Sequence, residues 1–363
     1  MKEAMRLFRK VCLLLPIVVV MVGFNYFIDP ANIFKNAKYY KEIADILLRG
    51  ENVVNLVNFD EKLLKKYYAY GLSEKTDILV LGSSRVMLLT ADMFPGKSFY
   101  NSSVSSATLE DDMSLYWMFR KKELLPKTLI IGLDPWLLNA SSVHTSARQS
   151  LAQEYQEILV YSEESVGKRR PSIFSSKYFE LFLPSYFQTS FKFWLNNLGK
   201  DKNEWAFYPT SQNVTDEIMR RVDGSINYGI NYRNASVDEV YVRALDFVRN
   251  PSMLNSFHYL DPDLIKRFEK FIDLIKKDKV EIVFYLSPYH PVVYDSLVKS
   301  EKFKMIIEAQ KYFEMYAKSK DIQLLGSYNP ADIGLGEDDF YDGMHQDAES
   351  IRKIFLKKIS ANN

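Results

Sequence analysis

Two short stretches near opposite ends of the chain carry side chains that could act together as a nucleophile and its base. The first is VLGSSRV, residues 80–86, in which Gly82 precedes a pair of serines. The second is YDGMHQD, residues 341–347, in which Asp342 and His345 flank a turn-forming glycine. A serine activated by a histidine that an aspartate orients attacks ester carbonyls. Taken alone, the second stretch is better explained as a surface turn, so catalysis requires that folding bring the two together.

Strands and helices alternate along much of the sequence. Apolar runs rich in β-branched residues predict strands at 77–82, 98–103, 128–133, 280–287 and 322–326. Between most of them, apolar residues recur at helical spacing. Such alternation is typical of a parallel sheet with helices on both faces. The predicted fold class is therefore α/β, a three-layer sandwich with a flavodoxin-like central parallel sheet.

The predicted sheet would bring the two stretches to one edge. Sites in parallel sheets lie at the carboxyl ends of the strands. Gly82 and the serines follow the first predicted strand, where nearby backbone N–H groups are free to receive an oxyanion. The second stretch precedes a last amphipathic helix, for which Asp347 is a suitable N-cap. We therefore expect Ser84, Asp342 and His345 to meet at this edge.

The residues GSS (82–84) and DGMH (342–345) resemble the first and last blocks of the SGNH (GDSL-like) hydrolase superfamily, Gly-Asp-Ser and Asp-x-x-His. The chain more closely resembles the membrane-anchored DltD proteins of lipoteichoic acid D-alanylation, which share an N-terminal anchor and both blocks. It is more distantly similar to the AlgJ and AlgX proteins of polysaccharide O-acetylation. The resemblance covers roughly 77–133 and 280–360. It implies that Ser84 is the nucleophile, His345 the general base and Asp342 the residue that orients His345.

The middle blocks depart from the family pattern. NSSVSSAT (101–108) places Ser106 where the family has a glycine whose N–H binds the oxyanion. GLDPW (132–136) places Asp134 where an asparagine side chain usually donates. A charged aspartate would repel an oxyanion, so Asp134 either points away, is protonated, or leaves the site with fewer donors.

Two further residues are candidates to line the site. Arg85 directly follows Ser84 and could pair with an acidic group there, although a solvated arginine fits the sequence as well. His290 follows the predicted strand 280–287 and could face the site or stiffen its loop.

The N-terminal residues predict a membrane anchor. A basic tail, residues 1–10, precedes an uncharged run at 11–28, which lies at the lower edge of bilayer-spanning length. The run ends in bulky residues rather than in a small-residue cleavage site. The positive-inside rule then predicts a single-pass protein of the cytoplasmic membrane, with its N-terminus inside and its main domain extracytoplasmic.

The rest of the chain divides into a predicted helical stalk at 29–76 and a hydrolase-like domain at 77–363. An insertion at about 134–260 lacks buried-strand runs and is predicted to be largely helical. The net charge of +1 does not favour nucleic-acid binding. The single cysteine excludes an intrachain disulfide, and no spacing of ligand residues suggests a metal site. No cofactor is predicted.

These features predict an extracytoplasmic serine esterase or O-acyltransferase that acts on acyl groups of a cell-surface polysaccharide. The resemblance implies a membrane-bound O-acyltransferase as partner. The sequence does not choose between hydrolysis and transfer, nor does it identify the acyl group or the glycan. The alternative is a catalytically silent binding or scaffold subunit of a polysaccharide-modification complex, which the atypical middle blocks permit.

Overall fold

The computed structural model describes residues 2–29, 37–56, 59–142, 150–162, 181–196, 198, 207–254 and 256–359. The side chains of residues 2–14 lie outside this description. So do parts of the predicted stalk (30–36 and 57–58) and of the predicted insertion, including 143–149, 163–180 and 199–206.

The centre of the molecule is a parallel sheet of five strands in the order β3-β2-β4-β8-β9. These strands are the predicted ones: β2 (Ile78–Leu81), β3 (Phe99–Asn101), β4 (Thr128–Gly132), β8 (Glu281–Leu286) and β9 (Gln323–Gly326). All four pairings between neighbours are parallel. The prediction of an α/β fold with a central parallel sheet is confirmed.

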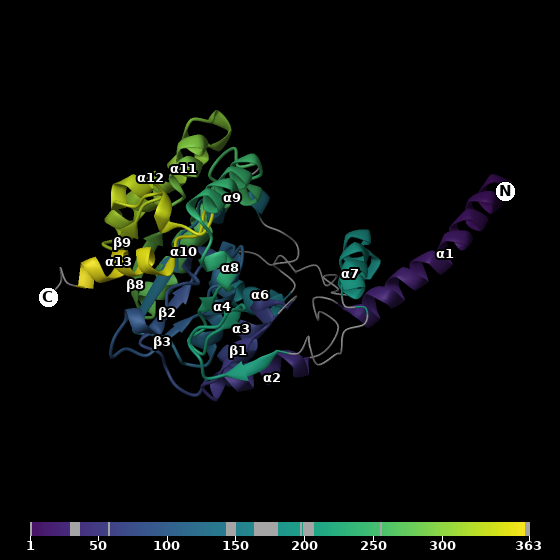
Figure 1. Ribbon diagram of the computed structural model, residues 1–363, viewed down its shortest axis with the longest axis horizontal. Coiled ribbons are helices and arrows are strands. Elements are labelled where there is room, and N and C mark those ends of the chain that lie inside the picture. The colour runs from purple at the N-terminus through teal and green to yellow at the C-terminus, as the bar shows by residue number, and fades with distance from the viewer. Residues whose placement is uncertain are drawn as a thin grey trace.

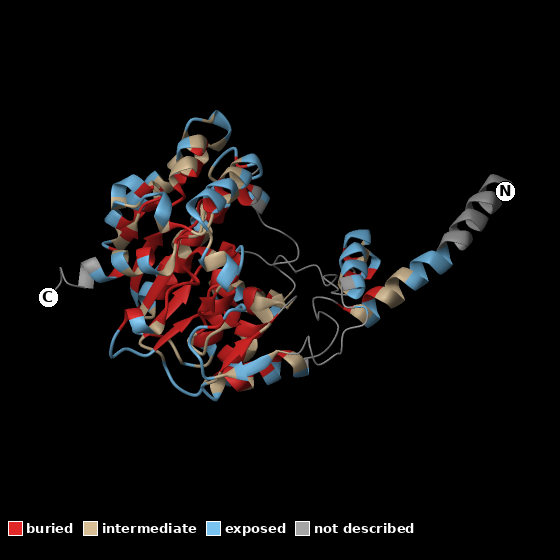
Figure 2. Cartoon of the chain, in the orientation of Figure 1, coloured by how far each residue is buried: buried red, intermediate tan, exposed pale blue. Residues whose placement is uncertain are grey.

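Helices cover both faces of this sheet, and most of its residues are buried (Figures 1 and 2). In β2, Leu79 and Leu81 belong to the larger apolar core, while Val80 belongs to the smaller one on the opposite face. The larger core includes side chains of α4 (Leu109–Lys121), α6 (Ala152–Ser162), α9 (Val237–Arg249), α10 (Pro262–Lys277), α11 (Pro291–Val298) and α12 (Met305–Ser319). The smaller core includes side chains of α13 (Ala348–Ile359).

A second sheet, which the sequence did not predict, joins the supposed stalk to the insertion. It has the order β5-β1-β6-β7 and antiparallel pairing. Its strands are β1 (Asn52–Val54), β5 (Tyr208–Thr210), β6 (Met219–Arg220) and β7 (Ile226–Asn227). Strands of two or three residues are too short to show an alternating pattern, and their pairing is long-range.

The predicted stalk is therefore not purely helical. Its helices are α2 (Ala37–Leu48) and α3 (Glu61–Gly71), with β1 between them. Side chains of both helices are buried in the larger core, including Tyr40, Ile43 and Leu64. The insertion likewise holds β5 to β7 beside its helices, so it is not purely helical either.

At the N-terminus, helix α1 (Lys2–Ile28) projects away from the sheet and lies beside α7 (Pro184–Asn196) of the insertion (Figure 1). Within the residues that the structure describes, no helix combines the length and apolar character needed to cross a membrane. The predicted membrane span at 11–28 stays a prediction.

Candidate active site

Ser84 lies immediately beyond the carboxyl end of β2, on a turn that only glycine permits. Gly82 has a φ of +131°, and a Cβ there would lie 3.1 Å from both the Cα and the O of Gly132, at the end of β4. Ser83 then caps the short 3₁₀ helix η1 (Ser84–Val86) by accepting the N–H of Arg85 at 3.2 Å. This tight turn places Ser84 as the first residue of η1.

The loop before α13 holds Asp342 and His345 by its own hydrogen bonds. Asp342 Oδ1 accepts the backbone N–H groups of Met344 and His345, both at 2.8 Å. A Cβ at Gly343 would lie 2.9 Å from side chains of α9 and α11, so glycine lets the loop pack closely there. Asp347 Oδ1 accepts the N–H of Ser350, as expected of a helix cap.

The structure brings these two segments together. Ser84 Oγ lies 2.8 Å from His345 Nε2, and His345 Nδ1 lies 2.8 Å from Asp342 Oδ2. With the Nδ1 proton donated to Asp342, Nε2 is free to accept the hydroxyl proton of Ser84. This series of hydrogen bonds, from serine to histidine to aspartate, has the connectivity that activates a serine nucleophile.

Tyr232 of the short helix α8 (Ile230–Arg233) also bonds to the aspartate, a contact that the sequence did not predict. Its hydroxyl donates to Asp342 Oδ2 at 2.6 Å. Burial and the Asp342 charge raise the pKa of Tyr232, which keeps its proton available for donation. Burial opposes ionisation of Asp342, but His345 and Tyr232 outweigh it and hold the pKa of Asp342 well below its usual value. Asp342 is thus an anion at neutral pH.

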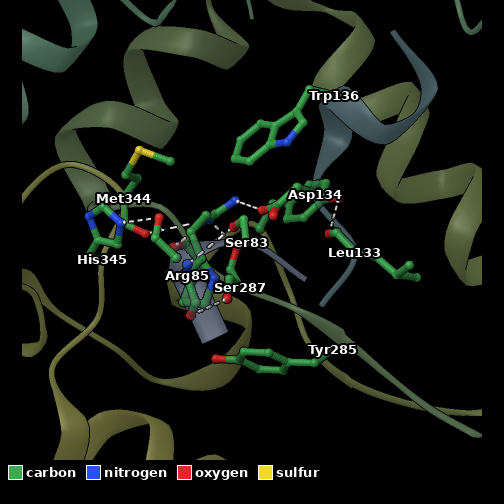
Figure 3. A network of polar contacts seen from close by, with 12 residues as sticks. Ser83, Arg85, Leu133, Asp134, Trp136, Tyr285, Ser287, Met344 and His345 are labelled. Carbon is green, nitrogen blue, oxygen red and sulfur yellow. Dashed lines mark hydrogen bonds and ion pairs between the residues drawn. The ribbon is translucent and has the colours of Figure 1, made fainter. Parts of the chain in front are cut away.

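Arg85 is buried rather than solvated and connects the turn that carries Ser84 to three other loops (Figure 3). Its Nη1 bonds to Asp134 Oδ1 at 2.8 Å, and its Nε donates to the carbonyl of Met344 at 3.1 Å. Its Nη2 donates to the carbonyls of Ser287 and Pro288, after β8. The guanidinium also lies 4.1 Å from the centre of the Tyr289 ring. Arg85 is therefore a buried junction between the segments that carry Ser84 and His345.

Asp134 points into this junction, which explains how an aspartate is tolerated near a predicted oxyanion site. It is buried, pairs with Arg85 and accepts a hydrogen bond from Ser83. Burial raises the pKa of Asp134, while Arg85 and Ser83 oppose the rise. Its side chain is committed to Arg85 and offers no donor to an oxyanion.

Backbone N–H groups near Ser84 are further candidates as donors for an oxyanion. Ser106 has a φ of +52°, a left-handed conformation that glycine adopts easily and that is uncommon for serine. Its neighbour Ser105 lines the same cavity as Ser84, with its own N–H bonded to Glu61. Neither Ser84 N–H nor Ser106 N–H bonds to another described residue. These two groups are the candidates for oxyanion donors.

His290 makes hydrogen bonds to α11 and to the loop that carries Asp342, and not to Ser84. It is fully buried and caps α11, where Nδ1 accepts the N–H of Val292 at 3.2 Å. Its backbone N–H donates to the carbonyl of Gly343 at 3.1 Å. Burial lowers the pKa of His290, so the neutral ring is favoured. Of the two readings of His290 that the sequence allowed, the structure favours the loop-stiffening one.

A cavity of about 520 Å³ opens beside the serine and histidine. It is lined by Ser84, Ser105, Asp216, Ile218, Tyr228, Gly229, Ile230, Asn231, Tyr232 and His345. Most of these residues come from the insertion, which the sequence connected only weakly to the site. The tyrosines around Gly229 were the only hint in the sequence that the insertion lines this cavity, and nothing in their spacing indicated that they approach Asp342.

A second cavity, of about 290 Å³, is apolar and lies away from these residues. Its lining includes Ile78 and Thr128, the first residues of β2 and β4, at the edge of the sheet opposite Ser84. In the part of the chain that the structure describes, no group of three or more His, Cys, Asp or Glu residues is arranged to hold a metal ion.

Neither the protein-family models nor the curated proteins include a match to this sequence. Among solved structures, the chain is similar to the crystal structure of a "putative acylhydrolase" from Bacteroides fragilis, with a TM-score of 0.38 and 9% sequence identity. The alignment covers 84% of this chain and 98% of that chain. A likeness at this level carries no functional argument, so the function must be drawn from the geometry of the site.

Proposed function

We propose that the protein is a serine esterase or acyltransferase of SGNH type. The observation that carries the proposal is the unbroken chain of contacts from Ser84 Oγ through His345 to Asp342, with both distances at 2.8 Å. A hydroxyl in that position, beside an open cavity, is a nucleophile poised for an acyl carbonyl.

In the first half of the reaction, Ser84 Oγ bonds to the carbonyl carbon and its proton passes to His345 Nε2. The carbonyl electron pair moves onto oxygen, and the N–H groups of Ser84 and Ser106 receive the negative charge. The intermediate collapses, the ester C–O bond breaks, and His345 returns the proton to the leaving alcohol. Asp342 holds Nδ1–H and stabilises the imidazolium while it exists.

In the second half, an acceptor hydroxyl gives its proton to His345 and attacks the acyl-serine. The bond between the acyl carbon and Ser84 Oγ then breaks, and His345 returns the proton to Ser84 Oγ. Water as acceptor makes the protein an esterase, and a sugar hydroxyl makes it a transferase. The lining of the cavity suits either acceptor, because it combines tyrosines with the polar residues Asp216 and Asn231.

We assign the substrate to the acyl groups of a cell-surface polysaccharide, on the resemblance in GSS and DGMH. The same resemblance suggests a membrane-bound O-acyltransferase as the source of the acyl group. The apolar run at 11–28 and the basic tail before it support a single-pass anchor with the domain outside the cytoplasm. A reporter that is active only outside the cytoplasm should give a signal when it is fused after residue 363. A signal from a reporter that is active only in the cytoplasm, fused at the same place, would overturn this orientation.

The activity is tested with the full chain in detergent and a chromogenic acetyl ester. Wild-type protein should turn over the ester, Ser84→Ala should not, and the control Ser105→Ala should retain most turnover. Adding an oligosaccharide acceptor then separates transfer from hydrolysis by the product formed. Failure of the wild type to turn over any short acyl ester, together with no labelling by a fluorophosphonate, would favour the silent binding subunit instead.

A further inference from the structure

Helices α1 and α7 form a unit of their own beside the catalytic domain (Figure 1). Phe24 of α1 lies against three aromatic rings of α7, with centroid distances of 5.4 Å to Phe187, 6.3 Å to Phe191 and 6.1 Å to Trp194. Two polar contacts fix the same junction. Asn25 Nδ2 donates to the carbonyl of Leu181, and the Tyr186 hydroxyl donates to Asp29 Oδ1, both at 2.9 Å.

Much of this unit is exposed (Figure 2), and large apolar side chains on both helices contribute to its surface. On α1, Leu15, Ile17 and Val20 are 60%, 65% and 68% exposed. On α7 and just beyond it, the exposed large side chains are Phe191, Trp194, Leu195 and Leu198. Within α7, Trp194 and Leu195 lie three and four residues after Phe191, which places these three side chains along one side of the helix. An exposed apolar surface of this extent marks a contact with another apolar phase.

The junction lies where the apolar run of α1 ends. Asn25 and Asp29 are the first polar and charged side chains after the run begins, so a bilayer that holds the run has its headgroup region near them. Tryptophan and tyrosine concentrate at that depth, since their rings are apolar and their N–H or O–H groups remain hydrated. Within α7 (Pro184–Asn196), Lys192 is the single charged residue, and a lysine suits the anionic headgroups of many membranes.

We infer that α7 is a membrane-surface helix, which docks its exposed aromatic side on the lipid headgroup region next to α1. A lipid surface covers the apolar sides of both helices at once, because it presents one continuous apolar phase to them. The inference rests on the membrane location proposed above and not on the acyl-transfer chemistry. Its consequence is that the insertion, which lines the cavity beside Ser84, is held to the membrane at a second point besides α1.

The test uses the full chain in vesicles of phosphatidylcholine and phosphatidylglycerol, with Trp194 as the probe. The chain has four tryptophans, so the Trp194 signal is the difference between wild type and Trp194→Phe. Vesicles contain lipids brominated either near the headgroup or near the chain ends, and iodide serves as the aqueous quencher. We expect the headgroup-proximal bromine to quench at least half of the Trp194 signal, with less quenching by the deep bromine and by iodide.

Other outcomes overturn the inference. Quenching by iodide alone places α7 in water, and protection from all three quenchers means that protein covers it. Flotation of the same vesicles tests the membrane location separately: a chain that does not float contradicts that location as well as the docking of α7. Ester turnover in detergent does not depend on either result. Gln188→Ala, at an exposed polar position on the same helix, is the matched variant and should leave the bromine quenching unchanged.

Discussion

Tyr232 and His345 bond to the same oxygen of Asp342. The tyrosine hydroxyl donates to Oδ2 at 2.6 Å, and His345 Nδ1 lies 2.8 Å from it. The two donors approach from separate parts of the chain, one from the insertion and one from the loop before α13. The insertion therefore helps to fix the carboxylate that orients the proposed base.

The first prediction concerns this bond. Tyr232→Phe should lower kcat about tenfold or more, because a hydrogen bond to a charged group contributes roughly 1.5–3 kcal/mol and 1.4 kcal/mol is tenfold in rate. KM should change much less, since the ring that lines the cavity stays. Tyr228→Phe is the matched control, as Tyr228 lines the same cavity but makes no hydrogen bond to Asp342. Equal effects of the two substitutions on kcat would show that Tyr232 does not position Asp342.

The second prediction distinguishes the adjacent serines. Ser84→Ala should abolish labelling by a fluorophosphonate, because Ser84 Oγ is the hydroxyl bonded to His345. Ser83→Ala should retain labelling but lower the thermal midpoint, since Ser83 caps η1 and bonds to Asp134. Loss of labelling in a well-folded Ser83→Ala, with labelling intact in Ser84→Ala, would move the nucleophile by one residue.

The third prediction concerns the unit formed by Asp342 and His345. Asp342→Asn should lower turnover severely, because an amide can donate to Nδ1 and favour the wrong tautomer. His345→Ala should cost as much or more, and the double variant should be little worse than His345→Ala. Steady-state kinetics of the four proteins measures this. Near-normal activity of Asp342→Asn beside an inactive His345→Ala would mean that Asp342 does not orient the base.

The fourth prediction concerns the buried pair Arg85 and Asp134. Arg85→Met should destabilise the protein by about 3–5 kcal/mol, since it leaves the Asp134 charge buried and unpaired. Adding Asp134→Asn should restore part of that loss, because the orphaned charge is removed. Thermal unfolding in detergent measures the cycle. Additive effects of the two substitutions would mean that the pair is not coupled.

The fifth prediction is a pH dependence from His290. Burial lowers its pKa in the folded protein, so the unfolded chain binds more protons as pH falls through about 6.5. Wild-type stability should therefore decline between about pH 7 and about pH 5 relative to His290→Asn, which keeps a capping oxygen for α11 and does not titrate. Thermal midpoints of both proteins across this range measure the difference. Parallel curves would show that His290 does not contribute to the acid sensitivity.

Local sequence determined the strands of the central sheet and the stretches that meet at its edge. Most of those strands are centred on short apolar runs, and GSS and DGMH each lie directly beside the element that presents them, so short-range pattern was sufficient. The same pattern predicted α4, α10, α12 and α13. Because parallel strands present their carboxyl ends at one edge, the fold class alone indicated that Ser84 and His345 would lie close together.

Tertiary structure decided the features that depend on long-range pairing. Strand β1 pairs with β5 and β6, which lie more than a hundred residues further along the chain. Each strand of this sheet has only two or three residues, which is too short to show a periodic pattern in the sequence. The sequence was equally compatible with a solvated and with a paired Arg85, because burial of a charge depends on the partners that folding supplies. The bond from Tyr232 to Asp342 spans 110 residues, and only the packing of the insertion against the last loop creates it.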